Sequence, residues 1–555
     1  MESALEAPTT PILTPTSSPR HSCPSSPCES HHSSHHVHHA KLQVLRPSTP
    51  TATATAPTRR RVGLVVFNKE QLPVIDALPK TPGKCAAIQS LLEAFGLLEK
   101  VESIIPAMAS AKDLTSFHGE DFVEALRKAS CDTPQTDSEN VEMEEDMEVY
   151  GLKDDCAPFP LLWQYARLTA GATILAARYL IECDREAFIA SSPDISPRTN
   201  SSSESVSRQA PLPPQPTTIQ ASPSTGTSSP SSSRSSSPSR GANPSSSLST
   251  PTTADVQTPP TPPDAQTVLQ GGAHYPVTTP PSATPSAGLS RQSSRLSQYT
   301  NYSSTSPGAV AIHWMGGRHH AKREEASGLC FVNDAVLGLL QLANHYERVL
   351  YIDIDVHHGD GTEEAFKYSK QVLTISCHLH EPGFYPGSGS IDEIGEGKAK
   401  YYTINVPFKE GVVDSQYSKL FDTIVAGAVA SYKPRAIVVV AGADCLSGDP
   451  LGGFNLTLHG VEHCMKTLLS YHLPLLILGG GGYNLPTVAR QAAIITAACL
   501  DSPLPDKIPP HSDLYVDSST YYTSLSNKAN HNSEEYLKML EATVLANLQY
   551  VQNDS

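Results

Sequence analysis

Residues 348–360 read RVLYIDIDVHHGD, and residues 435–449 read RAIVVVAGADCLSGD. In both stretches a run of aliphatic residues ends abruptly in acidic residues, histidine or glycine, which is typical of a buried strand followed by a functional loop. Two further apolar runs, QVLTISCHL at 371–379 and LPLLIL at 473–478, follow the same pattern, and segments with helical spacing separate the runs. The sequence therefore predicts an α/β fold: a single domain with a central, mostly parallel β-sheet flanked by helices on both faces.

Composition divides the chain of 555 residues, 47 of them Pro, into packed and low-complexity segments. Residues 1–58 are rich in Ser, Thr, Pro and His, and residues 190–308 are rich in Ser, Pro, Thr and Gln. Such segments cannot bury enough apolar surface to offset the entropy lost on ordering, so we expect a disordered N-terminal tail and a disordered insertion. The predicted domain thus comprises residues 59–189 and 309–555.

The net charge of −16 and the pI near 5.7 argue against a nucleic-acid-binding protein, because proteins that track phosphates usually carry a basic face. The 11 Cys are scattered without a paired C-x-x-C, which indicates a reducing compartment rather than a disulfide framework. We find neither a secretory signal nor an apolar run near the ~18 residues that a membrane helix needs. We therefore expect a soluble intracellular protein that contacts neither nucleic acid nor membrane.

Acidic and histidine residues at the predicted strand ends form a candidate metal site, because ligands gather at the carboxyl ends of strands in open α/β sheets. Asp353, Asp355 and His357 alternate on an extended segment, so their side chains can share one face. Asp444 follows another apolar run. Either Asp355 or Asp444 alone is more simply explained as a helix cap or a loop carboxylate. Together, Asp355, His357 and Asp444 supply three ligands with one position open, as in catalytic zinc sites.

Three other residues are candidates for proton transfer and for contact with a carbonyl oxygen. His319 and His320 follow the predicted strand AVAIHW and a Gly-Gly turn. Asp353 and Asp360 are available to pair with the two imidazoles and to set their tautomers and basicity. One histidine would act as general base and the other as acid or electrostatic partner. Tyr483, directly after the glycines of LGGGGYN, is placed to donate its hydroxyl to a developing oxyanion.

These segments together resemble the class I histone deacetylases. The motifs HHAK, EASG, D-x-D-x-HHGDGT, GAD and LGGGGYN all occur here in the family's order. The resemblance runs from about Arg59 to Tyr550 without the insertion, and it is closest to the branch that acts on histones and on the cohesin ring. It implies an arginase/deacetylase-like fold and lysine deacetylation. The implied metal ligands are Asp355, His357 and Asp444, and the implied catalytic residues are His319, His320, Asp353, Asp360 and Tyr483.

The resemblance also implies cofactors and a substrate channel. The catalytic ion would be Zn²⁺, with Fe²⁺ as an alternative, and a structural K⁺ would lie behind it. The family's K⁺ ligands correspond to oxygens around Asp353, Asp355, His357 and Ser376. Asp155 in YGLKDDCAP corresponds to the rim aspartate that grips the substrate backbone, with Asp154 as an adjacent competitor. The implied tunnel residues are Gly328, Leu329, Tyr385 and Leu451.

Three positions depart from the family's pattern. Leu329 stands where the family usually has a Phe that forms half of an aromatic sandwich around the lysine stem. Arg318 replaces an apolar residue beside the His pair, and Lys84 replaces an arginine that lines the acetate exit pocket. We expect these changes to alter acyl preference or product release. Hydrolysis should survive them, because no metal-binding or proton-transfer residue is lost.

The sequence thus predicts a zinc-dependent protein lysine deacetylase that acts on acetylated histone tails or a cohesin subunit in chromatin regulation. The predicted location is the nucleus, with the cytoplasm as a second location. Ser-Pro and Thr-Pro pairs in the insertion indicate phosphorylation sites and a binding segment for corepressor or regulatory partners. The alternatives are a polyamine or small-amide deacetylase and a non-catalytic scaffold that binds acetyl-lysine. A two-metal, arginase-like hydrolase is disfavoured, because no further acidic residue directly adjoins Asp444.

Overall fold

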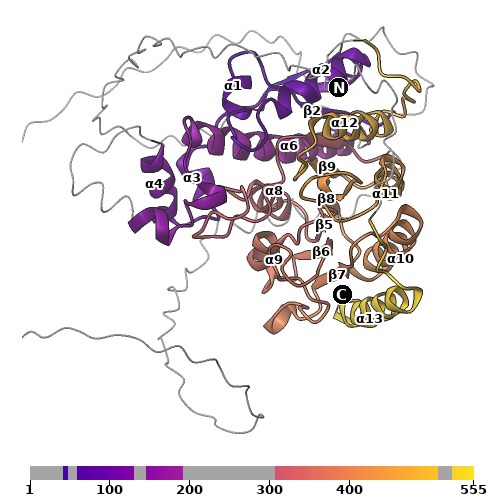
Figure 1. Ribbon diagram of the computed structural model, residues 1–555. Coiled ribbons are helices and arrows are strands. Elements are labelled where there is room, and N and C mark those ends of the chain that lie inside the picture. The colour runs from indigo at the N-terminus through magenta and orange to yellow at the C-terminus, as the bar shows by residue number, and fades with distance from the viewer. Residues whose placement is uncertain (1–41, 48–58, 131–144, 192–306, 511–527, 555) are drawn as a thin grey trace, which may run out of the picture. The chain divides into compact units, whose positions relative to one another are not determined.

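The computed structural model describes residues 42–47, 59–130, 145–191, 307–510 and 528–554 (Figure 1). Residues 1–195 and 290–555 belong to one compact unit, whereas the second unit, 196–289, lies outside the described residues. The described chain contains a nine-stranded sheet in the order β1-β3-β2-β4-β9-β8-β5-β6-β7. The strands are β1 (Val44–Leu45), β2 (Val62–Val65), β3 (Glu102–Ile104), β4 (Val310–His313), β5 (Val349–Asp353), β6 (Val372–Leu379), β7 (Thr403–Phe408), β8 (Ala436–Val440) and β9 (Leu475–Leu478).

Neighbouring strands of this sheet are parallel, except for the antiparallel pair β1 and β3. Every residue of β5, β6, β7, β8 and β9 is buried, as expected when helices cover both faces. The predicted α/β class with a mostly parallel sheet is confirmed. β2 pairs with β4, with Val62 opposite Val310, so the segments on either side of the insertion form one continuous sheet.

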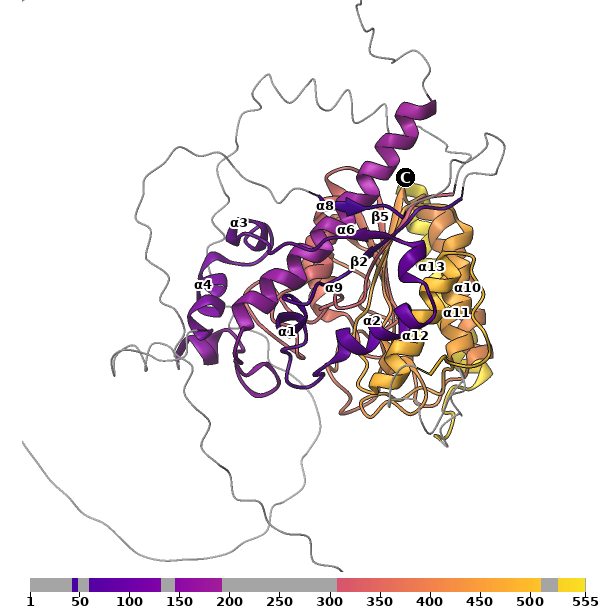
Figure 2. The ribbon, with the colours of Figure 1, turned by 90° about the horizontal axis from the view of Figure 1, so that it is seen from above.

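Helices lie on both faces of the sheet (Figure 2). One layer contains α10, α11, α12 and α13, and the opposite layer contains α6, α8 and α9 (Figures 1 and 2). The helices of the described chain are α1 (Leu72–Ile75), α2 (Lys84–Ala94), α3 (Ala111–Leu114), α4 (Glu120–Ala129), α6 (Leu162–Ser191), α8 (Asp334–Ala343), α9 (Asp360–Phe366), α10 (Asp414–Tyr432), α11 (Leu458–Ser470), α12 (Leu485–Cys499) and α13 (Glu534–Asp554). None of the helices in the described ranges combines the length and apolar character needed to cross a membrane.

One predicted boundary is wrong. We expected residues 1–58 to form a disordered tail, but Val44 and Leu45 form β1, which pairs with Ser103 and Ile104 of β3. A two-residue edge strand lacks a periodic apolar pattern, and its pairing depends on a partner strand nearly sixty residues away in the sequence. The rest of the predicted tail, and the predicted insertion from 192 to 306, lie outside the described residues. The helix before the insertion ends at Ser191, two residues beyond the predicted boundary.

Candidate metal centre and active site

The candidate metal-binding residues lie at the carboxyl ends of neighbouring strands. β5 ends at Asp353 and leads directly into Asp355 and His357. β8 pairs in parallel with β5, and the short 3-10 turn η4 (Ala443–Cys445), which follows β8, carries Asp444. Because both strands run in the same direction, this pairing brings the polar residues that follow them to one edge of the sheet.

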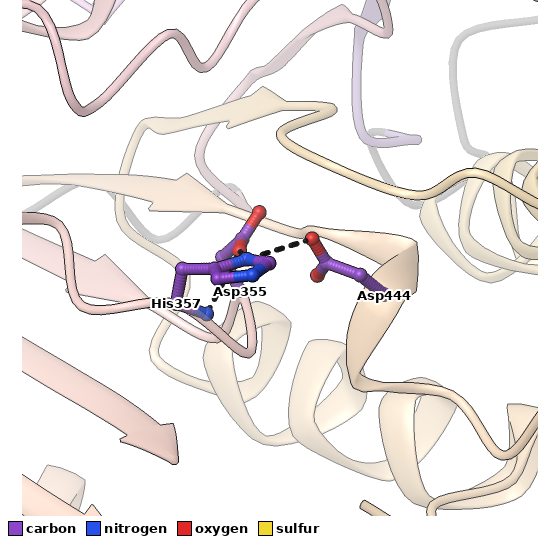
Figure 3. Close-up of side chains that lie close together, drawn as sticks. All are labelled: Asp355, His357 and Asp444. Atoms are coloured by element: carbon purple, nitrogen blue, oxygen red, sulfur yellow. Dashed lines mark hydrogen bonds and ion pairs between the residues drawn. The ribbon is translucent and has the colours of Figure 1, made fainter. Parts of the chain in front are cut away.

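Asp355, His357 and Asp444 converge on one point (Figure 3). Each residue offers one ligand atom, and the three atoms lie within 4.8 Å of one another. Nδ1 of His357 lies 3.1 Å from Oδ1 of Asp355 and 3.2 Å from Oδ2 of Asp444. All three side chains are buried. One imidazole nitrogen and two carboxylate oxygens in this arrangement form a suitable donor set for a divalent metal ion.

The electrostatics of this cluster also fit a cation. Oδ2 of Asp444 is buried and accepts no hydrogen bond of good geometry within the described chain. Burial, followed by the charge of Asp355, raises the pKa of Asp444 to about 6. Two buried carboxylates side by side are costly, because desolvation and mutual repulsion both disfavour their charged forms. A divalent cation would compensate both charges.

The glycine loop after β9 forms another wall of the metal centre. The N–H of Gly481 donates to Oδ2 of Asp355 over 2.7 Å. A Cβ atom on Gly481 would lie only 1.9 Å from Oδ2 of Asp444 and 3.0 Å from Oδ2 of Asp355. This position therefore requires glycine because the backbone approaches both carboxylates closely.

We expect Gly481→Ala to lower metal affinity and deacetylase activity by on the order of 10- to 100-fold, because the added methyl group displaces the carboxylate of Asp444. Metal content after dialysis and acetate release would measure the two effects. Gly383→Ala is the control, since a methyl group there meets no atom within 4 Å and only backbone conformation opposes it. Normal metal retention by Gly481→Ala would contradict the close packing described for this loop.

His319 and His320 lie in the loop after β4, and each forms a hydrogen bond with a carboxylate. Nδ1 of His319 lies 2.7 Å from Oδ2 of Asp353, and Nδ1 of His320 lies 2.7 Å from Oδ1 of Asp360. The two imidazole rings are adjacent, with centroids 4.0 Å apart. Nδ2 of Asn333 donates to the carbonyl oxygen of His319 over 3.2 Å and holds the loop in place. A carboxylate at Nδ1 favours the tautomer with a lone pair on Nε2.

The two histidines have different electrostatic environments. Burial lowers the pKa of His319, but the charges of Asp353 and Asp355 outweigh it and raise that pKa to about 9. Burial and the neighbouring charge of His319 lower the pKa of His320 to about 4. One ring therefore favours the charged form at neutral pH and the other the neutral form, which is the division expected of an acid and a base in one site.

Tyr483 follows the glycine loop and is fixed through its backbone. Its N–H donates to Oδ2 of Asp449 over 2.8 Å, and Oδ1 of Asp449 accepts the N–H of Leu451 over 3.0 Å. Burial, followed by the charges of Asp444 and Asp355, raises the pKa of Tyr483 well above its usual value. The hydroxyl is therefore protonated at neutral pH and can act as a hydrogen-bond donor.

The backbone at Gly328 lies beside the ring of His320. Gly328 and Leu329 both have positive φ, +52° and +65°, and a Leu in this conformation costs about 1 kcal/mol. A Cβ atom on Gly328 would lie 2.6 Å from Cδ2 of His320 and 2.7 Å from the hydroxyl oxygen of Tyr385. That hydroxyl lies 2.5 Å from Oγ of Ser327. The backbone at Gly328 is therefore in close contact with the rings of His320 and Tyr385.

Three of the predicted substrate-binding residues are exposed at the surface. Tyr385 is 41% exposed and Leu451 is 49% exposed. Asp155 is also exposed, and its Oδ1 lies 3.6 Å from Nζ of Lys80. The competing Asp154 has a φ of +48° and begins the 3-10 turn η2 (Asp154–Cys156). These three residues are therefore accessible to solvent, whereas the candidate metal ligands Asp355, His357 and Asp444 are buried.

Comparison with known proteins identifies the family. A model of the histone deacetylase domain matches residues 78–194 and 280–499, which is more than half of the chain. The chain belongs to the histone deacetylase family. It is a hydrolytic deacetylase, and the family predicted from the order of its motifs is confirmed. Residues 195–279 separate the two matched ranges, and β2 and β4, which lie on either side of that segment in the sequence, pair in one continuous sheet.

Several curated histone deacetylases are similar to this one. It is 29% identical over 499 residues to "Histone deacetylase 8" from Danio rerio, covering 89% of this chain and 97% of the relative. It is 30% identical over 432 residues to "Histone deacetylase 8" from Xenopus tropicalis, covering 78% and 82%. "Type-1 histone deacetylase 1" from Dictyostelium discoideum is 45% identical over 241 residues, covering 43% and 48%.

Three residues that were not predicted from the sequence also support this deacetylase site. Asp449 orients Tyr483 and Leu451, and Asn333 caps α8 while it holds the histidine loop. Phe384 stacks on His357, with ring centroids 5.2 Å apart and planes 8° from parallel. An Asn directly before the helical pattern DAVLGLLQLA is a recognisable N-cap signal. Nothing local in the sequence distinguishes Asp449 or Phe384 from an ordinary loop residue.

Proposed function

We propose that this deacetylase uses Zn²⁺ to hydrolyse the amide of Nε-acetyl-lysine in proteins. The convergence of Asp355, His357 and Asp444, in which two buried carboxylates face a single imidazole, supports a metal requirement most directly. Their N and O atoms suit Zn²⁺, and Fe²⁺ is the alternative ion. A structural K⁺ near Asp353 and Ser376 remains a proposal that rests on the family resemblance.

Bound Zn²⁺ would supply Lewis acidity to an amide carbonyl and would make a water molecule more acidic. The protein's own residues would then position the amide and move its protons. The channel beside Gly328 would hold the aliphatic stem of the lysine, and Asp155 at the rim would accept N–H groups of the substrate backbone. The phenolic O–H of Tyr483 would donate to the carbonyl oxygen as it becomes negative.

The position of His320 supports its role as general base. Its ring lies against Gly328, and its centroid is 4.9 Å from that of Tyr385. With Nδ1 bonded to Asp360, its Nε2 would accept a proton from water while the oxygen of that water bonds to the acyl carbon. The C–N bond then breaks, and His319 or His320 returns a proton to the lysine amine. The products are acetate and free lysine.

Substrate choice and location are also proposals. We propose acetylated histone tails or a cohesin subunit as substrates, a role in chromatin regulation, and a nuclear location with some cytoplasmic protein. The relatives are named histone deacetylases, and an enzyme that acts on histones is expected in the nucleus. Corepressor or regulatory partners would bind the segment from 190 to 308, most of which lies outside the described residues.

Acetate release from an acetylated histone-tail peptide by zinc-loaded protein would test this proposal. A cohesin-derived acetyl-lysine peptide and N-acetylspermidine would run beside it, with chelator-treated protein as the control. Turnover of the peptides but not of N-acetylspermidine would support a protein deacetylase. Faster turnover of N-acetylspermidine would instead support a polyamine deacetylase. Peptide binding without turnover of any substrate would favour the scaffold alternative.

We expect Leu329→Phe to lower KM for an acetyl-lysine peptide by roughly 2- to 10-fold, because a flat aromatic wall contacts the lysine stem better than a branched aliphatic one. The same substitution should change the ratio of butyryl to acetyl turnover, since it reshapes the channel. Steady-state kinetics on matched acetyl and butyryl peptides would measure both. Identical kinetics of the two proteins would show that position 329 does not shape the channel.

A further inference from the structure

A buried histidine, His118, lies behind the loop that carries His319 and His320. It follows α3 and precedes α4, and its exposed fraction is only 1%. The rings of Phe117 and Phe122 pack beside it, with centroid distances of 4.7 and 5.2 Å. The proposed mechanism gives this histidine no role. Because an unpaired polar group is costly to bury, the partners of its two ring nitrogens indicate what the residue does.

The hydrogen bonds of His118 allow only one protonation state. The backbone N–H of Asn333 donates to Nε2 of His118 over 3.0 Å. Nδ1 lies 3.2 Å from the carbonyl oxygen of Arg323. A backbone N–H can only donate and a carbonyl oxygen can only accept, so Nε2 keeps a lone pair and Nδ1 carries the proton. The ring is therefore neutral, and burial, which lowers the pKa of His118 to about 4, favours the same state.

The bond to Arg323 fixes one end of the segment 319–323. The carbonyl oxygen of Arg323 accepts Nδ1–H of His118 and also the backbone N–H of Gly119, over 3.1 Å. A Cβ atom on Gly119 would lie 2.0 Å from Oε2 of Glu324, so the chain there lies directly against the end of this segment. The turn between α3 and α4 therefore anchors the residues that follow the two catalytic histidines.

The bond to Asn333 fixes the other end of the segment. Nδ2 of Asn333 donates to the carbonyl oxygens of His319 and Ala321 over 3.2 and 2.9 Å. These carbonyl groups belong to the residues on either side of His320. Because His118 accepts the backbone N–H of Asn333, it holds the residue that in turn holds the backbone around His320.

The start of α9 contacts the same backbone from another direction. The N–H of Thr362 donates to the carbonyl oxygen of His319 over 3.0 Å. A Cβ atom on Gly361 would lie 2.7 Å from the carbonyl oxygen of His320, so the helix approaches this peptide closely. Asp360, the first residue of α9, bonds to the ring of His320 over 2.7 Å. A shift of the segment 319–323 would therefore change the geometry between His320 and Asp360.

We propose that His118 is a positioning residue for the general base, and that it acts by holding Asn333 and Arg323 so that the ring of His320 keeps its place beside Asp360. This inference rests on the proposed function, because that function makes His320 the base. His118 acts through backbone contacts and transfers no proton itself. A base must lie within hydrogen-bond reach of the proton that it accepts, so a small displacement lowers the rate of the chemical step.

The test measures kcat and KM for an acetyl-lysine peptide with zinc-loaded wild type, His118→Leu, His118→Gln and His345→Leu. Gln at position 118 keeps a neutral group that can both accept and donate, whereas Leu can do neither. His345→Leu is the matched control, because His345 is also a buried histidine and lies just beyond the opposite end of α8 from Asn333. Thermal melting and metal content would verify that each variant is folded and loaded.

We expect His118→Leu to lower kcat by on the order of 10- to 100-fold and to change KM by less than about twofold, because the base is displaced while substrate binding is kept. His118→Gln should recover part of kcat, and His345→Leu should change neither constant. An unchanged kcat in His118→Leu, or an equal loss in His345→Leu, would overturn the positioning role and leave the deacetylase function intact.

A double-mutant cycle distinguishes an effect on His320 from a general weakening of the fold. His320→Ala should retain measurable turnover, since a general base contributes about 10²- to 10⁴-fold. Adding His118→Leu to this variant should cause no further loss, whereas adding it to Tyr483→Phe should cause the same fold loss as in the wild type. Equal losses in the two backgrounds would contradict an action through His320.

Hydrogen exchange tests the same contacts without catalysis. The backbone N–H of Thr362 bonds to His319 and does not contact His118, so it reports whether the segment 319–323 is held. Its exchange should be on the order of 10-fold faster in His118→Leu and unchanged in His345→Leu. Unchanged exchange in His118→Leu would count against the positioning role. Faster exchange there, with no turnover of any peptide by the wild type, would support the contacts and count against the proposed hydrolysis.

Discussion

Asp444→Asn should abolish metal binding and lower deacetylation by on the order of 10³ or more, since the metal's Lewis acidity contributes several kcal/mol. The substitution removes one charged ligand from the group Asp355, His357 and Asp444. It keeps an oxygen at Oδ1, which accepts the N–H of Val356 over 3.1 Å, so the local backbone should hold its place. Metal analysis after dialysis and acetate release from an acetyl-lysine peptide would measure the two losses.

Asp444→Asn should lower activity, but it should not lower the thermal stability of the metal-free protein. Asp444→Asn removes one of two adjacent buried carboxylates, so the metal-free variant should unfold at the same temperature as metal-free wild type or higher. Added Zn²⁺ should stabilise the wild type, by about 2.7 kcal/mol at a free concentration 100 times its Kd, and should leave the variant unchanged.

Asp422→Asn is the control for Asp444→Asn, because Asp422 is a partly exposed carboxylate that pairs with His463. It should retain metal, activity and the thermal shift. Full activity of Asp444→Asn, or an equal thermal shift with Zn²⁺ in both proteins, would contradict the assignment of Asp444 as a metal ligand.

The local sequence was sufficient to predict the sheet and the positions of the polar residues at the carboxyl ends of its strands. Runs such as RAIVVVAGAD have no polar alternation, which is a strong indication of parallel strands buried on both faces. Since parallel strands end at the same edge, the residues that follow them had to lie near one another. The parallel topology alone therefore predicts that Asp355, His357 and Asp444 lie close together, independently of the family resemblance.

The parts that the sequence did not predict depend on contacts between distant segments. Asp449 is an ordinary turn residue until the glycine loop packs beside it and its carboxylate accepts the N–H of Tyr483. β1 exists only because β3 offers an edge for Val44 and Leu45. Arg318 was recognised as a departure in sequence, but its unpaired Nε is a property of the packed interior. Local patterns specify elements, whereas these features need the assembled fold.

We expect Tyr483→Phe to lower kcat by on the order of 10² to 10³, the usual effect of removing one oxyanion donor. The phenylalanine keeps the ring, and the backbone N–H can still donate to Asp449, so only the hydroxyl is lost. Because that donor acts mainly on charge that develops in the transition state, kcat and kcat/KM should fall together while KM changes little. Metal content should be unchanged, which separates this variant from Asp444→Asn.

Tyr432→Phe is the matched control, because it also removes a tyrosine hydroxyl. Tyr432 lies on α10, and its hydroxyl donates to the carbonyl oxygen of Lys370 over 3.0 Å. It should cost about 1 kcal/mol of stability and leave kcat unchanged. A fall of less than tenfold for Tyr483→Phe would transfer the oxyanion role to the metal and His319. The two variants together therefore distinguish a hydroxyl that stabilises the folded chain from one that stabilises the transition state.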